Sequence, residues 1–154
     1  MSTPRAKESI DLPGPPYAGA LLRLAWEGIR KRILRAIGEA GFDDIVPAHF
    51  SILVYPGPDQ VHPSDLAARA NISKQAANYL ISQLEERGYI ERRTVKGKGR
   101  LVCLTPRGRR LIPALHDAVR TIEVDFSRSV GAGQYRQFRE TLVRLVDLTA
   151  AEHV

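Results

Sequence analysis

The sequence contains one cysteine, few aromatic residues and no long apolar run, and two of these scarcities exclude classes of protein. The single cysteine, Cys103, excludes an internal disulfide framework and suits a reducing compartment. No apolar run approaches the ~18 residues that a membrane helix requires, so we expect no membrane partner. The first 17 residues are polar and rich in proline, so we expect no signal peptide and predict a cytoplasmic protein.

The sequence also lacks the motifs of the common enzyme classes. It has no Gly-rich phosphate loop and no nucleophile elbow. The four histidines, His49, His62, His116 and His153, include no pair at metal-ligand spacing. Cys103 has no evident activating neighbour, so we interpret it as an inert strand residue rather than a redox sensor. We therefore predict no enzymatic activity, no cofactor and no metal site.

The positive charge is concentrated in one segment. The chain of 154 residues has a net charge of +6 and a pI of about 9.8. Residues 91–110 contain eight Lys/Arg and one acid, a net +7, which leaves −1 for the other 134 residues. A local basic surplus favours a polyanionic partner such as double-stranded DNA. The alternative is a solvated charged hairpin with no partner.

The order of elements from His62 to Arg110 is that of a winged helix-turn-helix. Pro63 suits the first turn of a short helix, and Asn71 suits the left-handed residue of a tight turn. Ser73 is a predicted N-cap for a second helix that extends to about Arg87. Residues 90–95 and 100–104 then read as two strands joined by a turn at 97–99. Thr105 and Pro106 begin a long helix.

Helical patterns outside this segment carry more apolar surface than a small winged helix-turn-helix domain, called the reader below, can cover. They span about 16–39, 47–55, 105–130 and a last helix after a break at 131–133. A two-fold dimer would bury this extra apolar surface and present two winged domains to one duplex. In a monomer the same helices would instead cover the core of the chain itself. We predict a mostly α protein with a small β-hairpin wing. Its regions are an N-terminal arm (1–16), a dimerisation region (17–44 and 106–154) and a winged helix-turn-helix domain (45–105).

The second helix of the reader carries the candidate base contacts. Gln75 and Asn78 lie one turn apart on its polar face, and each amide matches the N6/N7 edge of adenine, with discrimination of about 1–3 kcal/mol. The alternative is that this face is only solvated. The full set of predicted DNA-contacting residues is Ser64, Ser73, Lys74, Gln75, Asn78, Tyr79, Ser82, Arg92, Lys96, Lys98 and Arg100.

The strings ISKQA, LEERGYIERR and LVCLTPRG in this order resemble the MarR family of bacterial transcriptional regulators. The resemblance covers the elements from about Tyr17 to Leu148. It implies a homodimer with interlocked terminal helices, a pseudo-palindromic operator, and repression that a small ligand or oxidant relieves. Two departures stand out. Residues 96–100, KGKGR, lack the aspartate that braces the wing arginine in the family, and His62 replaces the usual Thr or Ser.

We predict a DNA-binding transcriptional regulator, and a small-molecule effector is an expected partner. The candidate lining residues of its pocket are Trp26, Arg30, His49, Phe50 and His116, for which core packing or simple exposure is the alternative. A second hypothesis is a winged-helix module that binds protein and uses its charged wing as a solvated edge. Salt dependence of DNA affinity separates the two hypotheses.

Overall fold

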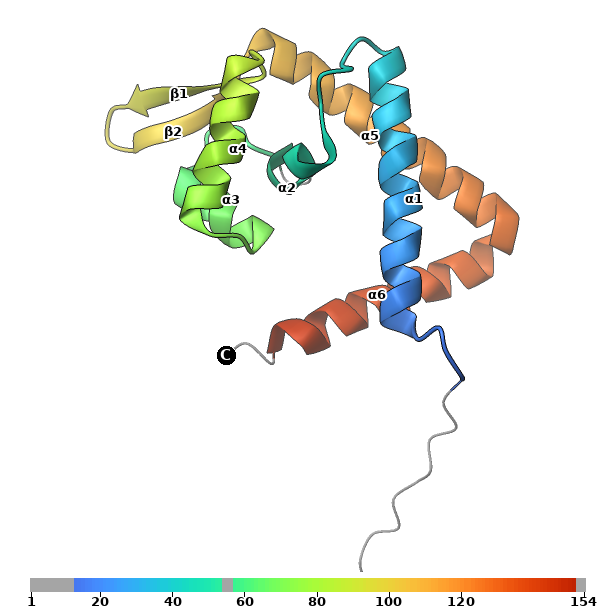
Figure 1. Cartoon of the computed structure of the whole chain (residues 1–154). Coiled ribbons are helices and arrows are strands. Elements are labelled where there is room, and N and C mark those ends of the chain that lie inside the picture. The colour runs from blue at the N-terminus through green and yellow to red at the C-terminus, as the bar shows by residue number, and fades with distance from the viewer. Residues whose placement is uncertain (1–12, 54–56, 152–154) are drawn as a thin grey trace, which may run out of the picture.

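The computed structural model describes residues 13–53 and 57–151, and it is mostly helical with one β-hairpin (Figure 1). In chain order the elements are α1 (Ala18–Glu39), the 3₁₀ turn η1 (Pro47–His49), α2 (Phe50–Leu53), α3 (Pro63–Ala70), α4 (Lys74–Glu86), β1 (Ile90–Val95), β2 (Gly99–Leu104), α5 (Pro106–Val130) and α6 (Ala132–Ala151). The mostly α fold with a hairpin wing is therefore confirmed.

Helices α3 and α4 form the helix-turn-helix unit for the local reasons that the sequence indicates. Pro63 occupies the first position of α3, and Asn71 takes a left-handed conformation (φ 52°) where the chain reverses. The hydroxyl of Ser73 then accepts a hydrogen bond from the Ala76 amide at 3.0 Å and caps α4. Leu66 on α3 and Ile81 on α4 are buried in the common core, which fixes one helix against the other.

The wing is an antiparallel hairpin, to which a single residue before α3 is joined by an isolated β-bridge. Ile90 pairs with Leu104 at its base, and Val95 pairs with Gly99 beside the tip. The second strand thus begins one residue earlier than expected, which leaves 96–98 as the connecting loop. Val61, before α3, extends the sheet because its amide and carbonyl both bond to Val102, at 3.1 and 2.8 Å. The wing is thereby joined to the start of the helix-turn-helix unit.

Helices α1, α5 and α6 lie on the other side of the molecule (Figure 1). Helix α5 leads away from the wing and packs against α1, and α6 turns back from its far end. The turn is made by Gly131 alone (φ 90°), because Ala132 and Gly133 are already helical; the expected break at 131–133 is shorter than predicted. No residue of α6 whose burial is described is buried.

Two other segments differ from expectation or fall outside the described chain. Residues 47–53 form a 3₁₀ turn followed by one turn of α-helix rather than one continuous helix. Phe50 and Leu53 are buried, and residues 54–55 of the expected span lie outside the described residues. Of the predicted arm, only 13–16 are described, and they are exposed.

A close contact joins the start of α5 to the start of the wing. Thr105 caps α5, since its hydroxyl accepts from the Gly108 amide at 3.1 Å, and its own amide donates to the Tyr89 carbonyl at 3.1 Å. A Cβ atom on Gly108 would lie 2.0 Å from that same carbonyl oxygen. Only glycine therefore allows α5 to pack this closely on the end of the reader.

We expect Gly108→Ala to destabilise the protein by about 2 kcal/mol or more, because neither the Tyr89 backbone nor α5 can move without losing core contacts. Urea unfolding at equal protein concentration measures the effect. Gly38→Ala is the matched control, since it adds a methyl to helix α1 where nothing lies within 4 Å, and it should be neutral or stabilising by about 0.5–1 kcal/mol. Equal stability of the two variants would contradict the close-contact account.

Candidate nucleic-acid interface

The outer face of α4 presents polar side chains to solvent. Lys74, Gln75 and Asn78 are exposed, and Tyr79 is 64% exposed although it is a large ring. On the opposite face Ala77, Ile81 and Leu84 are buried. Ser64 is exposed in the first turn of α3, and Ser82 is half-buried. The helix is thus held by its apolar face, and its N-terminal half offers donors and acceptors to a ligand.

The eight cations of residues 91–110 divide into two groups. Arg92, Arg93, Arg107 and Arg109 pair with Glu85, Glu91, Asp44 and Asp59, respectively. Lys96, Lys98, Arg100 and Arg110 are exposed and have no acidic partner within the described residues. Among the described residues, the unpaired cations of the hairpin therefore lie at its tip, while Arg92 joins β1 to α4 and Arg93 pairs within β1.

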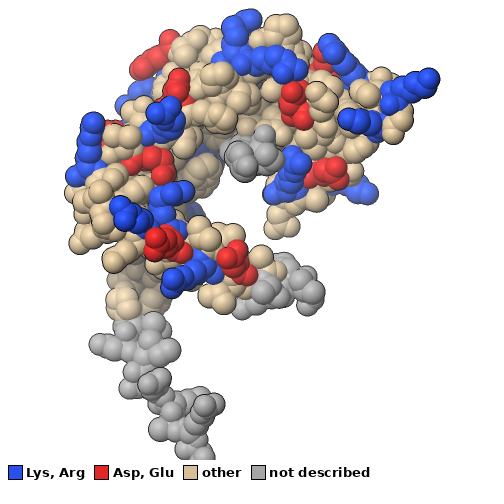
Figure 2. All heavy atoms as spheres, turned by 180° about the vertical axis from the view of Figure 1, so that it is seen from behind, with Lys and Arg blue, Asp and Glu red and all other residues tan. Residues whose placement is uncertain are grey.

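The charge pattern is visible on the surface (Figure 2). The hairpin projects at the right in that view and ends in Lys and Arg side chains, whereas basic and acidic side chains are interleaved over the long helices. Exposed charges at a projecting tip interact with a polyanion without first breaking an internal ion pair. The wing tip is thus the part of the described molecule best placed to meet a phosphate backbone.

Arg92 differs from the other basic residues of the wing because it turns back onto α4. Its side chain is only 14% exposed and pairs with the Glu85 carboxylate. The guanidinium also donates to the Ser82 hydroxyl at 3.2 Å and to the Asn78 carbonyl at 3.4 Å. Glu85 in turn accepts from the Arg92 backbone amide at 3.0 Å. The structure therefore places this predicted DNA contact in an internal bond network, with strand β1 tied to the recognition helix.

Sequence reasoning missed the junction that supports both reading elements. Tyr89 donates its hydroxyl to Asp44, and Arg107 makes two bonds to the same carboxylate, at 3.1 and 3.3 Å. The Arg107 guanidinium also lies 4.3 Å from the centre of the Tyr89 ring. Burial alone would raise the pKa of the Asp44 carboxyl, but the Tyr89 hydrogen bond and the Arg107 charge outweigh it and hold this pKa below its usual value.

His49, a predicted ligand contact, is a buried structural residue. Its Nδ1 accepts from the Val46 amide at 3.2 Å, so Nε2 carries the proton and donates to the Gln83 Oε1 at 3.0 Å. His49 thus connects η1 to the recognition helix. Burial lowers the pKa of His49, with a nearby Arg87 charge acting in the same direction, while the Gln83 bond opposes the shift less strongly.

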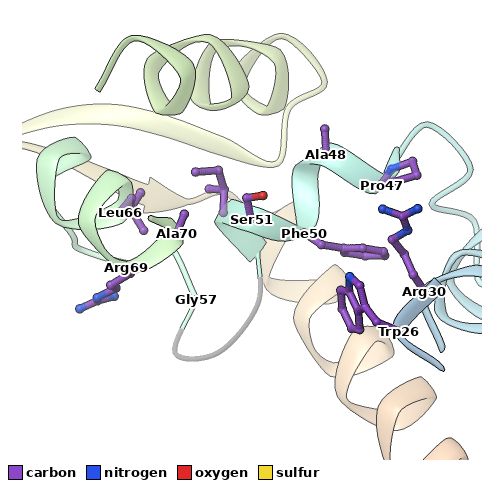
Figure 3. A pocket seen from close by; sticks show the side chains of 11 residues that line it. Trp26, Arg30, Pro47, Ala48, Phe50, Ser51, Gly57, Leu66, Arg69 and Ala70 are labelled. Atoms are coloured by element: carbon purple, nitrogen blue, oxygen red, sulfur yellow. The ribbon is translucent and has the colours of Figure 1, made fainter. Parts of the chain in front are cut away.

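A pocket of about 390 Å³ lies between α1, the 47–52 segment and α3 (Figure 3). Three of the five predicted ligand contacts, Trp26, Arg30 and Phe50, lie together at one end of it, and Arg69 extends from α3 at the other end. His49 and His116 are not among its lining residues, and His116 is exposed on α5. The ligand site stays a prediction, with a lining that now includes Arg69.

A second hollow, of about 470 Å³, lies between α1, α5 and α6 and has mainly apolar walls that include Ile29, Phe126 and Phe138.

Among the described residues no group of three or more His, Cys, Asp or Glu is arranged to hold a metal ion. None of the helices, over the part of the chain that is described, is long and apolar enough to cross a membrane.

Comparisons with known proteins agree with this geometry. The MarR family model matches residues 44–101. A MarR transcriptional regulator from Methanosarcina mazei Go1 has a similar structure (TM-score 0.75, 20% identity, 92% of this chain and 94% of that one). The MarR family protein Rv2887 of Mycobacterium tuberculosis, in complex with salicylic acid, is 26% identical (TM-score 0.60, 84% and 96%). CouR from Rhodococcus jostii RHA1, bound to p-coumaroyl-CoA, is 22% identical (TM-score 0.62, 82% and 89%). No curated protein matches the sequence.

The bonds of His49 predict a dependence of stability on pH. The folded protein resists protonation of this ring, because a proton on Nδ1 would face the Val46 amide hydrogen, whereas the unfolded chain takes up the proton near pH 6.5. The free energy of unfolding should therefore fall as the pH drops below about 6.5. Urea unfolding between pH 5 and 7.5 measures this slope. It should be shallower in His49→Gln than in wild type, and His116→Gln is the control for loss of an exposed imidazole. A wild-type slope in His49→Gln would refute the assignment.

Proposed function

The chain belongs to the MarR family through its winged helix-turn-helix domain, and on that premise we propose that it is a transcriptional repressor that binds a pseudo-palindromic operator as a homodimer. The observation that carries the proposal is the combination of two free surfaces in one domain. The capped helix α4 exposes Gln75 and Asn78, and the wing tip exposes cations that have no acidic partner in the part of the chain that is described. Such surfaces suit the major groove and the flanking backbone of one duplex.

We assign separate roles to the contact residues. The amides of Gln75 and Asn78 read adenine in the major groove, while Lys74, Tyr79 and Ser82 contact backbone or base edges beside them. Ser64 and Ser73 lie at the N-termini of α3 and α4, where helix ends favour phosphate. At the tip, Lys96, Lys98 and Arg100 interact with the minor groove or its phosphates.

Exposed apolar side chains support the homodimer. Over residues 13–53 and 57–151, fifteen large hydrophobic residues are exposed, and all of these but Val46 and Tyr79 lie on α1, α5 or α6 or at the start of α1. These include Leu21 and Trp26 on α1 and Val146 and Leu148 on α6. A second copy that covers this surface would place two reading helices on one face of a duplex. Residues 17–44 and 106–154 are accordingly our proposed dimerisation region.

The effector that we propose is an aromatic anion bound in the pocket of Figure 3. Trp26 and Phe50 offer ring surfaces, and Arg30 beside them offers positive charge to a carboxylate, while Arg69 lines the opposite end of the pocket. The ligands of Rv2887 and CouR, salicylic acid and p-coumaroyl-CoA, both combine an aromatic ring with an anionic group. Since the pocket wall is the 47–52 segment, whose residue His49 bonds to α4, occupancy would bias the recognition helix and release the operator. We further propose that the protein acts in the cytoplasm, as the resemblance to bacterial regulators implies.

Selection of bound duplexes from a random pool tests the proposed function. We expect a two-fold symmetric site, with A·T pairs at the positions read by the amides. In that site Gln75→Ala and Asn78→Ala should each weaken binding by about tenfold and broaden preference at one base position per half-site. Recovery of unenriched sequences would favour the protein-binding alternative, and a stable monomer by light scattering at micromolar concentration would refute the dimer.

The wing contributes affinity without base preference in this proposal. Lys98→Ala combined with Arg100→Ala should weaken binding about equally on all duplexes and reduce the slope of log affinity against log salt by about 2. Fluorescence anisotropy between 50 and 300 mM salt measures the slope. Arg93→Ala removes a wing cation that already pairs with Glu91 at 2.5 Å and should change the slope less. An unchanged slope in the double variant would exclude the tip from the interface.

A further inference from the structure

Arg92 and Glu85 form the most extensive polar connection between the wing and α4. Glu85 accepts from both the backbone amide and the guanidinium of Arg92, so one carboxylate fixes the strand and its side chain together. The same guanidinium reaches Ser82 and Asn78. These three positions on α4 are spaced by four and three residues, so Arg92 lies along one face of the recognition helix.

The opposite side of β1 is fixed as well. Arg92 pairs with Val102 across the hairpin, and Val102 pairs with Val61 before α3. The row of paired residues Val61, Val102 and Arg92 therefore joins the start of the helix-turn-helix unit to α4. The covalent link between α4 and β1, residues 87–89, is held separately, since the Tyr89 hydroxyl donates to Asp44 and the Thr105 hydroxyl donates to the Gly88 carbonyl. The Arg92 network adds a second connection, which runs from strand β1 directly to α4.

We propose that Arg92 is a positioning residue, which together with Glu85 sets the wing at the angle where its tip and α4 engage one duplex at the same time. This inference rests on the proposed DNA-binding function and replaces a direct DNA contact by Arg92. A guanidinium that is 14% exposed and already bonded to a carboxylate, a hydroxyl and a carbonyl has few donors left for phosphate. Its effect on affinity is transmitted through the orientation of the wing, because a displaced tip loses its own contacts.

The two roles of Arg92 make opposite predictions for its acidic partner. If Arg92 contacted phosphate, removal of the Glu85 charge would free the guanidinium and strengthen binding to a polyanion. If the pair positions the wing, Glu85→Ala should weaken operator binding, by about tenfold, although the variant is more positively charged. Glu86→Ala is the matched control, since this neighbouring exposed acid has no ion pair within the described residues and its removal should leave affinity equal or slightly higher.

The guanidinium geometry gives a second discriminating variant. Arg92→Lys keeps the charge, which suffices for a phosphate contact, but an ammonium group does not match the fork that spans the carboxylate and the two oxygens of α4. The positioning role predicts that Arg92→Lys binds operator nearly as weakly as Arg92→Ala. Retention of wild-type affinity by Arg92→Lys, together with a loss in Arg92→Ala, would assign a direct phosphate contact instead.

The experiment is anisotropy titration of the selected operator with full-length wild type, Glu85→Ala, Arg92→Ala, Arg92→Lys, Glu85→Ala/Arg92→Ala and Glu86→Ala, at several salt concentrations. We expect both alanine variants to weaken binding, and the double variant to bind no more weakly than the weaker-binding of the two single variants. The salt slope should fall to the same extent in Glu85→Ala and Arg92→Ala, because either change displaces the tip cations, whereas a direct phosphate contact predicts a smaller slope in Arg92→Ala alone. Circular dichroism and thermal unfolding verify that each variant is folded. Tighter or unchanged binding by folded Glu85→Ala overturns the inference. Failure of the wild type to select any duplex overturns the proposed function itself, a separate outcome.

Discussion

The contact on which the rest of the structure depends is the attachment of Tyr89 to Asp44, Arg107 and Gly108. The hydroxyl, the ring face and the backbone carbonyl of Tyr89 each have a different partner, contributed by the segment after α1 and by the first turn of α5. Helix α5 and the winged helix-turn-helix domain therefore share Tyr89 as a common contact. Because Tyr89 directly precedes β1, these contacts connect the first turn of α5 to the start of the wing.

Ion pairing determines which of the basic residues in 91–110 are available to a ligand. Four of its eight cations stabilise the reader by pairing with acids that lie elsewhere in the sequence or on the same strand. The net charge is unaffected, but the charge available to a ligand is localised at the tip and on Arg110. Among the described residues, the hairpin cations without an acidic partner thus lie at its tip, and an ion pair of Arg92 joins strand β1 to α4.

Local signals in the sequence predict the elements well because capping and turn chemistry act within a few residues. Ser73, Thr105, Asn71 and Pro63 all perform the roles expected of them. Long-range partners are different. Asp44 lies 45 and 63 residues from Tyr89 and Arg107, and no local pattern signals that pairing. Likewise, β-strand alternation alone does not reveal whether Arg92 faces solvent or α4. The predicted DNA contacts and the ligand pocket remain predictions, since no partner tests them.

The pairing of Val61 with Val102 has a consequence for solubility. A projecting hairpin normally exposes two open strand edges, and an open edge is a template for association with another chain. Here the outer edge of β2 is covered at its middle by Val61, and the Arg92 network holds β1 against α4. What remains uncovered is the short charged end, where lysines oppose the approach of a second strand. The wing can therefore extend into solvent in the free protein with little exposed backbone for self-association.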